Sequence, residues 1–153
     1  MKKKIISLLS ALALTAQIVP CALADGDVKV YVNDTEMVTD APIIIENNRT
    51  LVPVRAILEY LDYNVDWDGA TQKVTIAKDE TTLNLIIGDT QATRDIIYKG
   101  NTHSYKNPLE VAPQIINDST YIPLSDVANA FRLNITWDGD NREVHITQYK
   151  KGD

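Results

Sequence analysis

A short pattern occurs twice in this chain at a fixed offset. Thr50-Leu51-Val52-Pro53 is matched by Thr120-Tyr121-Ile122-Pro123, and Trp67-Asp68-Gly69 is matched by Trp137-Asp138-Gly139. In both cases the two copies stand 70 positions apart. A constant offset predicts one supersecondary unit used twice, and such units bury their apolar faces against each other. We therefore expect a single domain, residues 25–149, that contains two internal repeats at about 28–77 and 95–147.

The N-terminus has the composition of a secretory signal peptide, residues 1–24. Three lysines follow Met1, an apolar run comes next, and Ala22-Leu23-Ala24 provides the small residues that signal peptidases require. Cleavage is expected between Ala24 and Asp25. The predicted location is extracellular, with association to the cell wall as a further expectation.

Two other interpretations of this leader are weaker. A transmembrane anchor needs about 20 apolar residues, and this run is shorter and is interrupted by Pro20. A lipid anchor on Cys21 requires a small residue before the cysteine, and Pro20 is a poor one. Free secretion is therefore favoured over lipidation, although lipidation of Cys21 stays open.

Cleavage leaves an acidic chain without cysteine, because Cys21 is the only one. No disulfide can then support the fold, so the core must do so. The cleaved peptide takes three of the 15 basic residues and none of the 21 acidic ones, which changes the net charge from −6 to −9. An acidic surface disfavours nucleic acid as a partner, because binding of phosphates requires Lys and Arg. The tail, residues 150–153, is expected to be loose.

Alternation of apolar and polar residues predicts β-hairpins. Val28–Val32 and Glu36–Val38 are the arms of the first, with Asn33-Asp34 as its turn. A second is expected around Gly69, with Lys73–Ala77 as its returning arm. Further strands are predicted at Ile43–Ile45 and Thr50–Val52, and their counterparts recur in the second half. Leu83–Ile87 is predicted to be a strand that links the two copies.

Two short helices are predicted, one in each half. Pro53 and Pro123 suit the first helical position, where the missing N–H is no loss. Apolar residues follow each proline at the spacing i, i+3, i+4 and i+7, which forms one helical stripe. The predicted fold class is α+β, in which two pseudo-repeats form one mainly antiparallel twisted β-sheet with hairpins, packed on two short helices.

The sequence Asn48-Arg49-Thr50-Leu51-Val52-Pro53-Val54-Arg55, followed by a helix, Asn64–Asp68 and Lys73–Ile76, resembles the copper amine oxidase N-terminal-like domain, also called the stalk domain. The resemblance covers essentially the whole chain after the leader. It implies an α+β module of exported bacterial proteins, often Gram-positive ones. In the oxidases this domain is a non-catalytic appendage, and the copper and the quinone belong to another domain.

The second half departs from the family pattern. Ser119 and Ser125 stand where arginines usually flank the Thr-x-x-Pro core, so a role for those arginines transfers only to Arg49 and Arg55. The glycine that usually follows the helix is replaced by Tyr63 and Leu133.

No catalytic, metal or cofactor site is predicted. A copper site of the oxidase type needs three histidines, and the chain has only His103, expected in a polar loop, and His145, expected to point outward from a strand. Asp66 and Asp68 share the solvent face of a strand. The segment Asp138–Asn141 lacks the ligand spacing of a calcium loop and is expected to be a hairpin turn.

The candidate binding residues are two tryptophans and two arginines. Trp67 and Trp137 share the strand parity of Val65 and Ile135, so we expect them in the core rather than on a ligand. If exposed, they would stack on sugar rings or anchor a partner. Arg49 and Arg55 are expected to brace buried carbonyls and acids, with a ligand carboxylate as the alternative.

These observations favour a secreted, non-catalytic binding or interaction module of a bacterial cell envelope, with a cell-wall polymer or an envelope protein as partner. Two alternatives stay open. One is a small cell-wall hydrolase, which would need a nucleophile or two positioned carboxylates. The other is a structural spacer that assembles through exposed strand edges.

Overall fold

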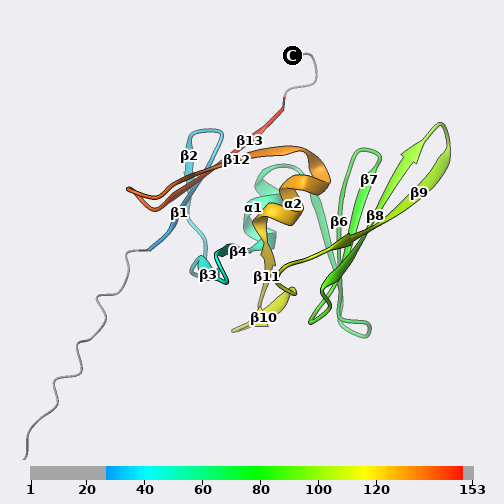
Figure 1. Ribbon diagram of the computed structural model, residues 1–153, viewed down its shortest axis with the longest axis horizontal. Coiled ribbons are helices and arrows are strands. Elements are labelled where there is room, and N and C mark those ends of the chain that lie inside the picture. Colours follow the sequence, from blue (N-terminus) through cyan, green and yellow to red (C-terminus); the bar gives the residue numbers. More distant parts are fainter. Residues whose placement is uncertain (1–26, 150–153) are drawn as a thin grey trace, which may run out of the picture.

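The computed structural model describes residues 27–149, which form an α+β fold of mostly antiparallel strands and two short helices (Figure 1). The prediction of this class is confirmed. The prediction of one continuous sheet is wrong, because the strands form three separate sheets. The predicted signal peptide (1–24), its cleavage site between Ala24 and Asp25 and the tail (150–153) lie outside the described residues.

The largest sheet has five strands in the order β5-β6-β7-β8-β9, and every neighbouring pair in it is antiparallel. Because each strand pairs with the one that precedes it, short turns suffice to connect them. Lys99 and Gly100 connect β8 to β9 with φ values of 50° and 77°, as a two-residue hairpin turn requires. The strands are β5 (Asn64–Asp68), β6 (Lys73–Lys78), β7 (Thr81–Ile86), β8 (Gln91–Tyr98) and β9 (Asn101–Pro108).

A four-stranded sheet, β12-β13-β1-β2, joins the two ends of the described chain. Its central pair, β1 and β13, is parallel, with Val30 opposite Val144 and Val32 opposite Ile146. All four of these side chains are buried, so this long-range pairing is fixed by apolar contacts. The strands are β1 (Lys29–Val32), β2 (Thr35–Met37), β12 (Leu133–Asp138) and β13 (Glu143–Gln148).

The third sheet, β10-β11-β4-β3, connects the two halves through the antiparallel pair β4–β11. Val52 lies opposite Ile122 at the middle of this pair, and both are buried. The hairpin turns beside them contain residues with positive φ, Asn47-Asn48 and Asn117-Asp118, and Asn and Asp tolerate this conformation better than most residues. The strands are β3 (Ile44–Glu46), β4 (Arg49–Pro53), β10 (Gln114–Ile116) and β11 (Ser119–Pro123).

The helices α1 (Val54–Tyr60) and α2 (Leu124–Phe131) follow β4 and β11 directly. Each begins one residue later than predicted, because Pro53 and Pro123 keep an extended backbone and stay in their strands as N-caps. Left-handed residues end both helices, Asp62 at φ 61° and Arg132 at φ 56°. Within the described residues, no helix has the length and apolar character that a membrane span requires.

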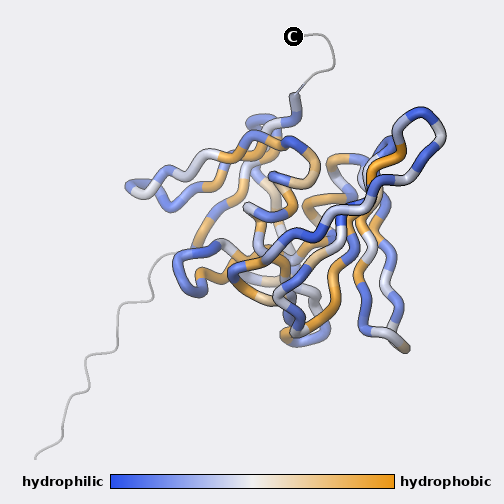
Figure 2. Tube along the Cα trace, turned by 45° about the vertical axis from the view of Figure 1, so that its right-hand side comes forward, coloured by the Kyte–Doolittle hydropathy of each residue, from blue (hydrophilic) through white to orange (hydrophobic). Residues whose placement is uncertain are grey.

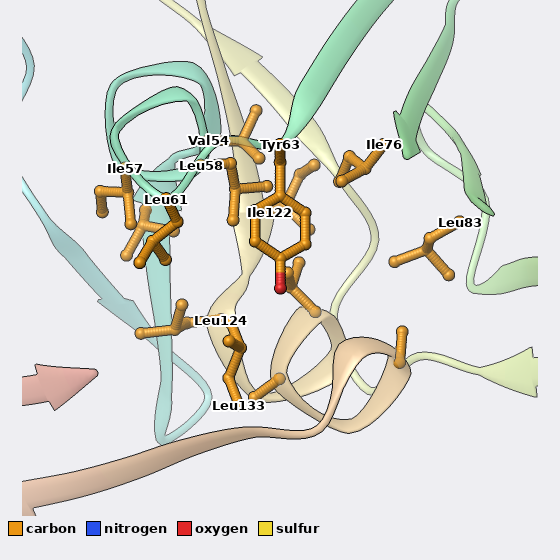
Figure 3. Close-up of a cluster of buried hydrophobic side chains, with 14 of the residues drawn as sticks. Val54, Ile57, Leu58, Leu61, Tyr63, Ile76, Leu83, Ile122, Leu124 and Leu133 are labelled. Carbon is orange, nitrogen blue, oxygen red and sulfur yellow. The ribbon is translucent and has the colours of Figure 1, made fainter. Parts of the chain in front are cut away.

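The helices lie in the middle of the molecule, between the β1 sheet and the five-stranded sheet (Figure 1). The hydrophobic segments of the chain converge there (Figure 2), and Figure 3 shows side chains of both helices pointing toward the same interior. Tyr63 and Phe131 meet edge to face, with ring centroids 4.8 Å apart. The main core therefore contains side chains from both halves, among them Leu58, Leu61, Ile76, Leu83, Ile122, Leu124 and Leu133.

Candidate functional site

Both tryptophans are exposed, so the prediction that they belong to the core is wrong. Trp67 has 39% of its surface accessible and Trp137 has 47%. Strand parity assigned the correct face but not its coverage. Val65, two residues earlier in the strand, lies opposite Ile76 and belongs to the main core. Trp67 lies opposite Val74, nearer the turn of the hairpin.

The turn after β5 contacts the indole of Trp67. The Asp68 carboxylate accepts hydrogen bonds from the Ala70 N–H at 2.9 Å and the Thr71 hydroxyl at 2.7 Å. These bonds lower the pKa of Asp68, and the bond from the Thr71 hydroxyl contributes most. A Cβ on Gly69 would stand 3.5 Å from the indole nitrogen, so the ring lies directly against the glycine. The Trp-Asp-Gly sequence thus places a hydrogen-bonded turn against an exposed aromatic ring.

The second copy of this turn has the same construction. The Asp138 carboxylate accepts bonds from the Asp140 N–H at 3.0 Å and the Asn141 side-chain amide at 2.8 Å, and its pKa is lowered, chiefly by Asn141. A Cβ on Gly139 would stand 3.3 Å from the indole nitrogen of Trp137. The predicted hairpin turn is confirmed, and its carboxylate is used inside the turn.

A groove of about 540 Å³ opens beside Trp67. Its volume falls in the range of small-ligand sites. Parts of both halves form it, since α1 and β5 meet the end of the β10–β11 hairpin there. The apolar lining includes Pro53, Val54, Ala56, Val65, Trp67, Val74 and Ile115, and the polar lining consists of Asp40, Arg55, Glu59, Asp66, Asp118, Ser119 and Thr120.

The polar lining of the groove is acidic. Four carboxylates line it and Arg55 is its one cation among the described lining residues. The Nε of Arg55 lies 3.8 Å from a carboxylate oxygen of Glu59, one helical turn later. Both side chains are more than half exposed, so this pair is worth little as a stabilising contact and its groups stay accessible to a ligand.

Arg49 lies outside this groove and forms a different contact. Its guanidinium donates to the Glu110 carboxylate, with Nε at 2.6 Å from Oε2, and this bond raises the pKa of Arg49. Glu110 is an exposed acid, whereas the arginine was expected to brace buried groups. The positions 70 residues away, Ser119 and Asp40, line the groove. Ser119, which lines the groove, therefore occupies the position in the second half that Arg49 occupies in the first.

The two histidines lie on different sheets. His103 belongs to strand β9, so its predicted location in a loop is wrong. His145 belongs to β13, where its ring stacks on Tyr31 with centroids 4.9 Å apart, and its Nε2 lies 3.3 Å from Glu143. No group of three or more His, Cys, Asp or Glu side chains among residues 27–149 is placed to hold a metal ion.

Sequence reasoning identified Trp67 and Arg55, which the structure brings together, but not the opposite wall of the groove. Asp118, Ser119 and Thr120 reach it from the second half, about 50 residues further along the chain. Only the pairing of β4 with β11 places them there. No local pattern signals such a contact.

Comparison with known families identifies the family of this chain. A family model described as the copper amine oxidase N-terminal domain matches residues 31–146. The chain belongs to the copper amine oxidase N-terminal domain family. In the oxidases this domain is a non-catalytic module. No curated protein and no solved structure matches the chain.

Replacing Gly69 with valine should displace the Trp67 indole, because the branched side chain needs the space that the ring occupies. In a Trp137→Phe background, which leaves one tryptophan, we expect Gly69→Val to shift the fluorescence emission to longer wavelength and to increase quenching by acrylamide. Gly69→Ala is the matched control, since its Cβ at 3.5 Å makes an ordinary contact. Identical spectra for the two variants would show that the turn does not hold the ring.

Asp126 should make stability fall as pH rises. Its burial raises the pKa of this carboxyl, a change that Arg49 opposes and Glu110 reinforces. The folded state therefore binds the proton more tightly than the unfolded state, and the free energy of unfolding declines between the unfolded pKa of about 4 and the raised folded value. In urea titrations at several pH values, Asp126→Asn should gain stability relative to wild type across this window.

The contrasting variant is Asp68→Asn. Because the folded pKa of Asp68 is lowered, its contribution is present above about pH 4 and disappears as pH falls through the folded value. This variant should lose stability relative to wild type as pH rises from 2 to about 5. Parallel pH trends in the two variants would contradict the assignment of opposite shifts.

Proposed function

We propose that this protein is a secreted, non-catalytic binding module of a bacterial cell envelope. Its mature domain comprises residues 25–149, built from two repeats, after removal of residues 1–24. Membership of the copper amine oxidase N-terminal domain family supports a module without catalysis of its own. The leader sequence supports export.

One observation carries the proposal, namely that Trp67 stands outside the core on a support made by its own turn. An exposed indole loses the free energy of burial, about 25 cal/mol for each Å² left in water. The hydrogen bonds that the Asp68 carboxylate accepts within the turn, and the close approach of the ring to Gly69, keep the indole in place at the border of a groove. A fixed aromatic ring beside a groove is the arrangement of a binding site, because little entropy is lost when a ligand covers it.

The chemistry of the groove favours a neutral glycan of the wall as its ligand. The indole offers a flat apolar face to a sugar ring. The carboxylates of Asp40 and Asp118 can accept hydrogen bonds from sugar hydroxyls, and such charge-assisted bonds are strong. Phosphate-rich wall polymers are disfavoured, because the polar lining has four acids and one arginine.

The same four carboxylates favour a second candidate, a small cell-wall hydrolase. Glycoside hydrolases use a pair of carboxyl groups, one of them with a raised pKa. Among residues 27–149, a raised carboxyl pKa is found at Asp126, which lies with Arg49 and Glu110 and is not part of the groove lining. We therefore rank the hydrolase second.

Sedimentation with purified peptidoglycan tests the binding function. We expect the wild-type chain to sediment with the wall and Trp67→Ala to stay largely in the supernatant, with affinity reduced at least tenfold. Trp137→Ala is the matched control, since it removes an exposed indole on the same kind of turn away from the groove. Circular dichroism establishes that all three proteins are folded.

Two results would contradict the proposal. Equal sedimentation of the Trp67→Ala and Trp137→Ala variants would remove the groove from the binding site. Release of soluble fragments from labelled peptidoglycan by the wild-type chain, abolished by Asp66→Asn or Glu59→Gln, would replace the binding module with the hydrolase.

A further inference from the structure

Strand β9 is an unusually long free edge. Each of the three sheets ends in two edge strands, and β2, β3 and β10 have only three residues each. The edges β5 and β12 are of medium length and carry aspartates, for example Asp66 and Asp138. Strand β9 has eight residues, Asn101–Pro108, and almost all are exposed. Short or charged edges prevent strand pairing between molecules, and β9 lacks both protections over most of its length.

The hairpin register shows which backbone groups of β9 are free. Lys99-Gly100 is a two-residue turn, so Tyr98 and Asn101 form the hydrogen-bonded pair that closes it. Hydrogen-bonded and non-hydrogen-bonded pairs then alternate along the ladder. The N–H and C=O groups of Thr102, Ser104 and Lys106 therefore point away from β8. Pro108 has no N–H and ends the row.

We propose that β9 pairs antiparallel with β9 of a second copy of this chain, centred on Ser104. In this register Ser104 faces Ser104 of the second copy, and Thr102 faces Lys106 in both directions. The three free residues of each strand then form six backbone hydrogen bonds. The two five-stranded sheets become one continuous sheet of ten strands.

The side chains are complementary in this register. His103 lies opposite Tyr105 of the second copy at a non-hydrogen-bonded position, where side chains approach most closely. Two such aromatic pairs form, and pairs of this kind stabilise a sheet. On the other face each Lys106 lies beside Thr102, so no two lysines oppose each other.

Charge also favours pairing at this edge. The chain has a net charge of −6, yet residues 101–108 contain Lys106 and no acid. Asp95, the nearest acid across the ladder, lies on β8, where Ser104 donates to it at 2.6 Å and Asn84 at 3.0 Å. Two copies can therefore approach through β9 with less repulsion than through an acidic edge such as β5.

The shape of the molecule leaves this edge open. The tip of the β8–β9 hairpin projects from the body in two views (Figures 1 and 2). The proposal concerns assembly and does not depend on the groove at Trp67.

A single introduced cysteine tests the register. In the full chain with Cys21→Ser, Ser104→Cys places two thiols opposite each other, with Cα atoms about 5.5 Å apart, which a disulfide can span. Thr102→Cys is the matched control, because its thiol faces Lys106 and is displaced from its copy by four residues, about 13 Å along the strand. We expect mild oxidation to join the Ser104→Cys chains at least tenfold faster.

Light scattering after size exclusion gives the second measurement. The cysteine-free chain should have twice the mass of one chain, and Ser104→Pro, which removes an outward N–H and leaves the β8 ladder intact, should have the mass of one chain. A monomeric wild type, a dimer that persists in Ser104→Pro, or equal cross-linking at positions 102 and 104 would each overturn the proposal. In the monomeric case the edge would remain free for a strand of another protein.

Discussion

The antiparallel pair β4–β11 is the contact on which the rest of this structure depends. Val52 and Ile122, which occupy positions 70 residues apart, face each other at its centre, and both side chains are buried. Each strand continues without a loop into a helix, so the pairing also fixes where α1 and α2 begin. The helices then fill the interior between the β1 sheet and the five-stranded sheet (Figure 1).

The groove is a consequence of the same pairing. Because β11 lies beside β4, the end of the β10–β11 hairpin reaches α1 and β5 and supplies Asp118 and Ser119 to the lining. The environment of Trp67, which lines this groove, is set separately by its own turn, in which Asp68 accepts backbone hydrogen bonds and Gly69 contacts the indole. The groove therefore depends on the packing of both halves, whereas the contacts under the Trp67 ring come from the five consecutive residues Trp67–Thr71.

Local features of the fold could be predicted from the sequence, whereas long-range partners could not. Asn33-Asp34 indicated a hairpin turn, and apolar spacing indicated both helices. The parallel pair β1–β13 had no such signal, because strands of alternating valines fit several partners. Parity placed Trp67 on the inner face of its strand, but it could not show that this end of the face is left uncovered. The opposite wall of the groove was missed because the long-range pairing of β4 with β11 brings it there.

The most direct test of the binding account is to follow the two indole N–H resonances in a ¹⁵N spectrum while solubilised wall glycan is added. Trp137→Phe assigns the two signals. The account predicts that the Trp67 resonance moves in a saturable manner while the Trp137 resonance keeps its position. If the Trp67 resonance stays fixed while other signals of the protein move, the ligand binds elsewhere and the groove is not the site.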